Sequence, residues 1–223
     1  KCTNKDSLTL DCKIIECPLG LNLTNQKEID EFDRNYYDCE YIEKWLDIRS
    51  NVSDAIYDLS GLRSIKYVGE DIDITDCKIR NLNGLQNIKY VGKGIYLLWN
   101  DFINSFEGMP NLDTLNSLHI SSGNDSLQNF NGLYASKRIN ELTLFSTAIQ
   151  SFKGMEGVNE IGKLSVSFSD QLTDLSGLEN IERITDLSLS SNENLLSIKE
   201  IDNVNVYDSS SLNLSFNKKL EWC

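Results

Sequence analysis

The chain has 223 residues, of which 40% are hydrophobic and 25% are charged, as in an ordinary soluble folded protein. Its formal net charge of −13 disfavours binding to nucleic acid or anionic lipid, because phosphate groups repel a strongly acidic surface. The sequence has no apolar run of about 18 residues, so it predicts no membrane-spanning helix.

Cysteines are concentrated at the start of the chain, where four of the six are found: Cys2, Cys12, Cys17 and Cys39. An even cluster of this kind predicts two disulfides in a cysteine-rich cap, and therefore an oxidising compartment. Zinc is the alternative, but the gaps do not match paired zinc-ligand spacings and the single histidine, His119, is far away. We assign residues 1–45 to this cap, with residues 8–10 as a candidate strand.

A repeat of about 23 residues follows the cap. Each copy carries an apolar residue, a spacer, a glycine and a second apolar residue, as in Leu59-Ser-Gly61-Leu62. The glycines lie 23, 24, 24, 22 and 23 residues apart, at Gly61, Gly84, Gly108, Gly132, Gly154 and Gly177. A seventh copy has Glu200 in place of glycine. Regular spacing of this kind indicates a repeat architecture.

Each repeat also contains a short apolar-x-apolar triplet, which is the pattern of a β-strand. The triplets begin at Leu46, Ile72, Ile95, Leu118, Leu142, Leu164, Leu187 and Leu212. No single repeat can bury its own apolar side, so stacking of repeats must form the core. We therefore predict a β-rich solenoid with one parallel sheet and about eight repeats, covering residues 46–223.

A small polar residue follows each strand by three positions: Cys77, Asn100, Gly123, Thr147, Ser169, Asn192 and Asn217. We expect this column to hydrogen-bond backbone groups of the adjacent coil. Cys77 could pair with Cys39 or remain a buried thiol. It cannot pair with Cys223, because six rungs of about 4.8 Å separate them.

The chain resembles the leucine-rich-repeat superfamily. The segment LNGLQNIKYVGKGIYLLWN at 82–100, the cysteine-rich start and the closing run 217–223 are most similar to receptor L domains. Such domains occur in insulin-receptor and epidermal-growth-factor-receptor ectodomains, and in fungal and bacterial surface proteins. The resemblance implies a right-handed coil that serves as a binding scaffold, secreted or at the cell surface. It does not extend to receptor signalling.

Residues that could support catalysis are few. His119 has no nucleophile motif around it, so a catalytic triad is not indicated. The acids Glu70, Asp71, Asp73 and Asp76 could cleave glycosides as a pair or bind calcium, but their order is not that of an EF-hand loop. We expect a protein that is not an enzyme and has no metal or cofactor. A carbohydrate-binding or carbohydrate-active solenoid is the alternative.

The outward positions of the strands are where a ligand would bind. The middle residues of the triplets form one ladder: Asp47, Asp73, Tyr96, His119, Thr143, Ser165, Ser188 and Asn213. The next outward residues form a second: Thr75, Leu98, Ser121, Phe145, Ser167, Ser190 and Ser215. Because grouped exposed aromatics mark interaction sites, we predict a patch that binds a protein or peptide. Its residues are Asp47, Asp73, Tyr96, Leu98, Trp99, His119 and Phe145.

Two further patterns concern sugars. The second half of the ladders is rich in hydroxyl groups, which makes a glycan a possible partner. Four Asn-x-Ser/Thr sites would carry N-linked glycans in a glycosylating host, at Asn22, Asn51, Asn124 and Asn213.

Overall fold

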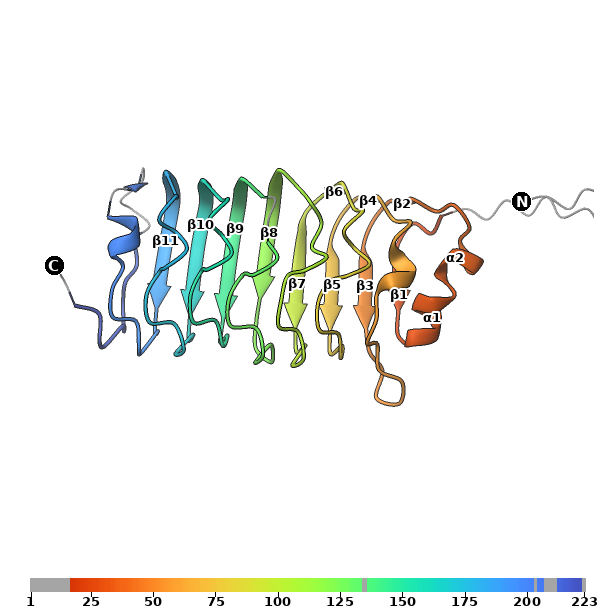
Figure 1. Ribbon diagram of the computed structural model, residues 1–223, viewed down its shortest axis with the longest axis horizontal. Coiled ribbons are helices and arrows are strands. Elements are labelled where there is room, and N and C mark those ends of the chain that lie inside the picture. Colours follow the sequence, from red (N-terminus) through yellow and green to blue (C-terminus); the bar gives the residue numbers. More distant parts are fainter. Residues whose placement is uncertain (1–16, 134–135, 203, 207–211, 222–223) are drawn as a thin grey trace, which may run out of the picture.

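The computed structural model describes residues 17–133, 136–202, 204–206 and 212–221. Over these residues the chain is a β-solenoid whose coils stack along one long axis (Figure 1). The predicted solenoid and parallel sheet are thus confirmed. Cys2, Cys12 and Cys223 lie outside the described residues, as does the candidate strand at 8–10.

A parallel sheet of nine strands runs the length of the solenoid in the order β1-β3-β5-β7-β8-β9-β10-β11-β12. Its strands are β1 (Leu21–Leu23), β3 (Leu46–Arg49), β5 (Ile72–Thr75), β7 (Gly94–Leu98), β8 (Thr114–Ile120), β9 (Arg138–Phe145), β10 (Glu160–Ser167), β11 (Arg183–Ser190) and β12 (Asn205–Val206). The register pairs Asp73 with Tyr96 and Tyr96 with His119, which confirms the outward ladder. Strand β1, within the range assigned to the cap, already forms the first rung.

A second, three-stranded sheet adds to the predicted one. It consists of β2 (Tyr41–Ile42), β4 (Tyr67–Val68) and β6 (Tyr90–Val91), in the order β2-β4-β6. These strands exist because the first coils turn a corner before entering the main sheet, at Glu43 in the β2 coil, Gly69 in the β4 coil and Gly92 in the β6 coil. A Cβ atom at Gly92 would lie 1.8 Å from the carbonyl oxygen of Gly69, so this last corner needs glycine.

The second half of the solenoid has no such corner. Between the inward-pointing residues Val91 and Ile95 the chain advances four positions, whereas between Leu115 and Leu118 it advances three. The shorter connection keeps both residues in one strand, and β8 to β11 are accordingly seven or eight residues long. One residue per coil therefore decides between one strand and two.

The amino-terminal end is closed by a disulfide and two short helices. Cys17 and Cys39 are bonded, with Cα atoms 5.3 Å apart, so the prediction that Cys39 belongs to a cap disulfide is confirmed. Helices α1 (Gln26–Asp30) and α2 (Phe32–Asn35) bury Ile29 and Phe32 and contact the 3₁₀ turn η1 (Ser60–Leu62). Within the described ranges, none of the helices has the length and apolar character needed to cross a membrane.

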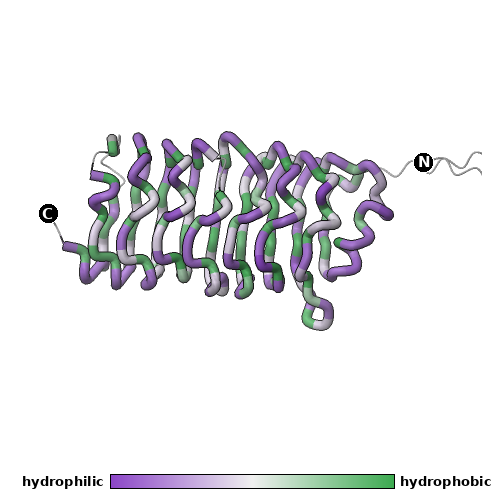
Figure 2. The backbone as a smooth tube through the Cα atoms, viewed as in Figure 1, coloured by the Kyte–Doolittle hydropathy of each residue, from purple (hydrophilic) through white to green (hydrophobic). Residues whose placement is uncertain are grey.

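The core is built from columns of equivalent apolar residues, which recur from coil to coil along the chain (Figure 2). The residue two positions before the turn glycine is leucine in the early coils and phenylalanine in the middle ones. Rings of Phe106, Phe130 and Phe152 stack with centroids 5.3 and 5.5 Å apart and nearly parallel planes. All three side chains are fully buried.

The predicted polar column is present, with one correction. Asn100 donates through Nδ2 to the carbonyls of Ile74 (2.9 Å) and Leu98 (3.1 Å), and its Oδ1 accepts from the backbone of Cys77 (3.0 Å). The prediction of Gly123 for this column was wrong. An extra residue after β8 shifts the role to Asn124, which is buried. The buried, hydrogen-bonded amide of Asn124 is also inaccessible to glycosylation in this fold.

Cys77 occupies the same column as a free, buried thiol. Its sulfur lies 3.4 Å from the carbonyl oxygen of Thr75 and 3.6 Å from that of Ile48. Burial raises the pKa of this thiol. Because Cys39 is bonded to Cys17, it does not pair with Cys77, and of the two alternatives the buried free thiol is the one found.

A residue with left-handed backbone precedes the polar column in successive coils. Its φ is positive at Asp76, Trp99, Gly123, Ser146, Phe168, Ser191 and Phe216. The left-handed residue ends the strand sharply and turns the following polar side chain inward. Large side chains are disfavoured there by roughly 1–2 kcal/mol, yet Trp99, Phe168 and Phe216 occupy it and are exposed.

Candidate functional site

The sheet-face patch consists of Asp47, Asp71, Asp73, Tyr96 and His119 on strands β3, β5, β7 and β8 and the turn before β5. Tyr96 and His119 are neighbours in the ladder, and their rings stack with centroids 5.8 Å apart at 28°. Gly94 leaves room for Ser117 and for the tyrosine, because a Cβ atom there would lie 2.8 Å from the Cβ of Ser117 and 3.1 Å from the Tyr96 ring. The two rings form a half-buried platform on the open sheet.

Three carboxylates lie beside this platform. The buried Oδ1 atoms of Asp47 and Asp71 accept no hydrogen bond from any described residue. The cations beside them are not at hydrogen-bonding distance: Arg49 Nε lies 3.7 Å from Oδ1 of Asp47, and Lys93 Nζ lies 3.7 Å from Oδ2 of Asp71. Burial, with repulsion from Asp47 and Asp71, raises the pKa of Asp73. The patch therefore has a negative potential that a cation would relieve.

The two rings of the platform remain neutral near neutral pH. Burial lowers the pKa of His119, with Glu141 opposing that shift. Burial, together with the charge of Asp71, raises the pKa of Tyr96. A neutral imidazole and a neutral phenol beside carboxylates present no positive charge that would repel a cationic ligand.

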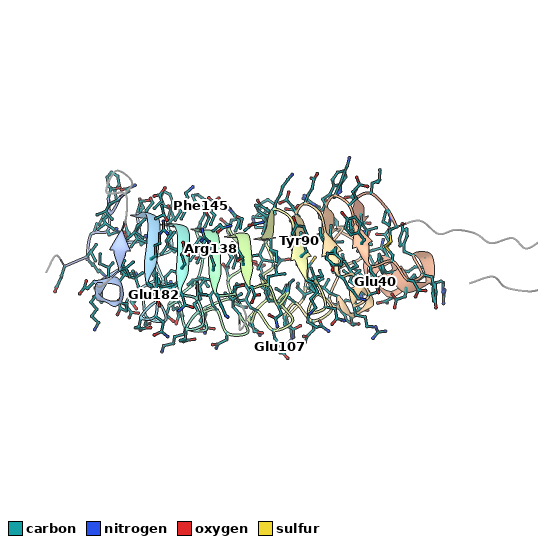
Figure 3. The ribbon with its side chains drawn as sticks, turned by 90° about the horizontal axis from the view of Figure 1, so that it is seen from above. Glu40, Tyr90, Glu107, Arg138, Phe145 and Glu182 are labelled. Atoms are coloured by element: carbon teal, nitrogen blue, oxygen red, sulfur yellow. A yellow bond between two sulfur atoms is a disulfide. The ribbon has the colours of Figure 1, made fainter. Side chains whose placement is uncertain are left out.

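The predicted binding residues fall into two groups. Asp47, Asp73, Tyr96 and His119 are together in the sheet-face patch. Leu98, Trp99 and Phe145 lie instead along the carboxyl-terminal edge of the strands, where Trp99 and Phe145 are exposed (Phe145 is labelled in Figure 3). Thr75, predicted to point outward on this edge, is buried, so that prediction was wrong.

Sequence reasoning missed two sets of exposed aromatics. Phe168 packs edge-to-face on Phe145, with centroids 5.5 Å apart. Phe168 could have been found from the sequence, because it occupies the same repeat position as Trp99, one residue before the polar column. Tyrosines 41, 67 and 90 form an exposed column on the three-stranded sheet (Tyr90 is labelled in Figure 3). Their signal was the repeated Tyr-Val-Gly at 67–69 and 90–92.

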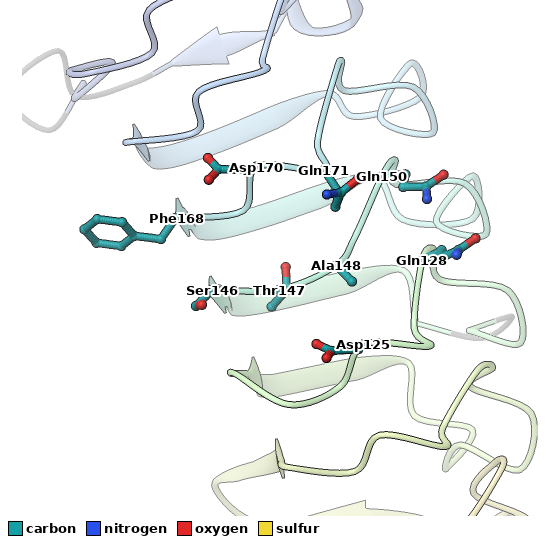
Figure 4. A pocket seen from close by; sticks show the side chains of 9 residues that line it. All are labelled: Asp125, Gln128, Ser146, Thr147, Ala148, Gln150, Phe168, Asp170 and Gln171. Carbon is teal, nitrogen blue, oxygen red and sulfur yellow. The ribbon is translucent and has the colours of Figure 1, made fainter.

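A cleft of about 400 Å³ lies on a different side, at the turns that follow β8, β9 and β10 (Figure 4). Its lining is mostly polar: Asp125, Gln128, Ser146, Thr147, Ala148, Gln150, Phe168, Asp170 and Gln171. Asp73, the carboxyl group with the raised pKa, lies on the open sheet and not in this cleft. Among the described residues, no three His, Cys, Asp or Glu side chains are grouped so as to hold a metal ion.

Comparison of the chain with family models, curated proteins and solved structures found no match. Function therefore has to be inferred from the chemistry of these surfaces.

Proposed function

We propose that this protein is a recognition module that binds a protein or peptide through the sheet-face patch, and that the bound group is a lysine or arginine side chain. The observation that carries the proposal is the Tyr96–His119 stack beside the partly exposed carboxylates of Asp47, Asp71 and Asp73. A cationic side chain would lie over the aromatic platform and pair with the exposed part of these carboxylates. The patch is open, as a surface for an extended ligand would be.

Long-range electrostatics support the same ligand class. The formal net charge of −13 attracts basic segments and speeds their encounter with the protein. The Cys17–Cys39 disulfide supports a secreted or cell-surface location, which accords with the resemblance to receptor L domains. We include that location and membership of the leucine-rich-repeat superfamily in the proposal.

The test is selection of peptides from a random displayed library against the immobilised protein, followed by calorimetric titration of the enriched peptides. We expect enrichment of lysine or arginine. Truncation of the platform in Tyr96→Ala should weaken binding about tenfold or more, since anchor residues typically contribute above 1 kcal/mol. Ser188→Ala, on the same ladder in the second half, is the matched control and should bind as the wild type does.

The pH dependence sharpens this test. Because the pKa of His119 is lowered, the ring gains its proton only in acid, where it would repel a cationic ligand. Binding should therefore weaken as the pH falls, and His119→Gln should reduce this dependence. Enrichment of acidic or uncharged peptides, or unchanged affinity in Tyr96→Ala, would contradict the proposal.

A further inference from the structure

The turn that follows β3 is three residues longer than its counterpart in the next coil. Eight positions separate Ile48 on β3 from the buried Ile56, whereas five separate the equivalent Ile74 from the buried Ile79. Both Ile56 and Ile79 stand three positions before the leucine that opens their glycine phrase, so they occupy the same place in the repeat. The added residues form a loop that extends past the carboxyl-terminal end of β3 (orange in Figure 1).

This loop contains one of the four sequons, Asn51-Val52-Ser53. The three residues and the following Asp54 are all exposed, and Val52 is 108% exposed. They therefore add no contact to the apolar core. A backbone bridge joins Asn51 to Asp54, and the amide N–H of Asn51 donates to the carbonyl of Thr24 (3.0 Å). The insertion thus holds a sequon in a defined turn outside the body of the solenoid.

The side-chain oxygen of Asn51 organises this turn, whereas the side-chain nitrogen is free. Oδ1 accepts from the backbone N–H of Ser53 (3.0 Å), from the hydroxyl of Ser53 (3.0 Å) and from the backbone N–H of Asp54 (2.8 Å). Among the described residues, Nδ2 of Asn51 has no hydrogen-bond partner. The atom that bears the sugar in an N-linked glycan is therefore open to solvent.

Two other sequons lie on the outward ladder of the main sheet and have other hydrogen bonds. At Asn22 the hydroxyl of the sequon residue Thr24 donates to the carboxylate of Glu28 (3.2 Å) and not to the asparagine. Asn213 uses its own Nδ2 to donate to the hydroxyl of Ser188 (3.4 Å). Of the exposed sequons in the described ranges, Asn51 alone combines a free nitrogen with a serine hydroxyl on its oxygen.

The fourth sequon cannot carry a glycan in the folded protein. Asn124 is buried, and its Nδ2 donates to the carbonyls of Leu97 (3.2 Å) and Ser121. A saccharide on this nitrogen would replace both bonds and would need space inside a close-packed interior. A chain that received a glycan at Asn124 before folding could not close this coil. Folded molecules must therefore be free of sugar there.

From these observations we infer that Asn51 is an N-glycosylation site and that Asn124 is unmodified in the folded protein. The sugar donor is an oligosaccharide linked to a lipid through a diphosphate. The amide nitrogen of Asn51 forms a bond to C1 of the sugar, the bond from C1 to the diphosphate oxygen breaks, and the nitrogen gives up one proton. The inference rests on the secreted or cell-surface location included in the proposed function, and not on the sheet-face patch.

The experiment is secretion of the full chain, behind a cleavable leader peptide, from a eukaryotic cell line that glycosylates its secreted proteins. Folded protein is recovered from the medium, and an amidase releases its N-linked glycans in water enriched in oxygen-18. This reaction converts each asparagine that carried a glycan into labelled aspartate, which peptide mass spectrometry locates. We expect the label at position 51 in most molecules and no label at position 124.

Two serine variants make the outcome decisive. Ser53→Ala removes the sequon but keeps Asn51, and should lower the mass of the secreted protein by one glycan. Its melting temperature should change by less than about 2 °C, because the altered residue is exposed. Ser126→Ala removes the Asn124 sequon through another exposed serine, and is the matched control that should leave the glycan mass unchanged.

Both serine variants should bind sheet-face peptides as the wild type does, so the glycan site and the patch can fail independently. The absence of label at position 51, or an unchanged mass in Ser53→Ala, would overturn the assignment of Asn51. Label at position 124 in folded protein would overturn the second part of the inference.

Discussion

The two halves of the solenoid share one core but differ at the corner before the main sheet. In the first half a four-position advance produces two strands per coil, and in the second half a three-position advance produces one long strand. The buried columns run through both halves without a break. The composition of the core therefore does not determine whether a coil forms one strand or two. The number of residues at the corner determines it.

The outward faces of the halves differ as well. The first half presents carboxylates and stacked rings, whereas the second presents hydroxyls that bond to one another, as between Ser167 and Ser190 (3.0 Å). Hydroxyls paired in this way have less capacity left for a ligand. The comparison thus favours the first half as the surface that binds a ligand.

The largest expected effect tests the core of the middle coils. Phe130→Ala removes the central ring of the stack with Phe106 and Phe152, and should lower the free energy of unfolding by about 3–5 kcal/mol. Phe130→Leu reproduces the leucine of the first-half coils and should cost less than about 1.5 kcal/mol. Urea denaturation measures both. Equal costs for the two variants would contradict this expectation, because they would show that leucine cannot replace the stacked ring.

An intermediate effect tests the first-half corner. In Gly92→Ala the new Cβ meets the carbonyl oxygen of Gly69, so the backbones must separate, at about 1–3 kcal/mol. Gly157→Ala, at an exposed turn, is the control and should be neutral or slightly stabilising. Denaturation again gives the values. Hydrogen exchange should speed up at β4 and β6, and unchanged exchange there would contradict the role given to Gly92.

The smallest effect concerns Asp73. Because its pKa is raised, the folded state holds this proton more tightly than the unfolded chain does. The associated stability is present in acid and is lost as the pH rises through the folded-state pKa. Asp73→Asn avoids this loss and should be more stable than the wild type at neutral pH, by about 0.5 kcal/mol because solvent screens a half-exposed group.

The gain in Asp73→Asn should vanish as the medium becomes acidic enough to protonate the native carboxylate. Asp101→Asn, an exposed acid elsewhere, controls for the general effect of reducing the negative charge. Thermal melting over a range of pH measures both variants. A gain that is independent of pH would rule out the proton linkage.

Much of the fold could be read from the sequence, because the glycine phrase marks each turn and the triplets mark each strand. These two signals gave the correct register from Asp47 to Ser188. The left-handed column could not be anticipated from residue preferences, since tryptophan and phenylalanine are poor choices for that conformation. The shift from Gly123 to Asn124 was hidden because both are small residues common in turns.

The candidate sites were less predictable than the fold. Alternation placed Tyr96 and His119 on one face, but nothing in the pattern showed that Trp99 turns to the edge. The cleft after β8, β9 and β10 was visible only as a 22-residue interval between glycines, which arises because Ala148 alone separates Thr147 from Ile149. A spacing gives the place of a deletion, but the cavity depends on the side chains that line it, such as Ala148 and Gln150.

The short turn at Ala148 and the corner at Gly92 have a common consequence for how the surface of this solenoid can change over evolution. At each place, one residue gained or lost alters the exterior of a single coil, while the buried columns of the neighbouring coils keep their register. Point substitution alone would have to remodel several side chains to reach the same result. A stacked architecture can therefore acquire new surface relief through short insertions and deletions, one coil at a time.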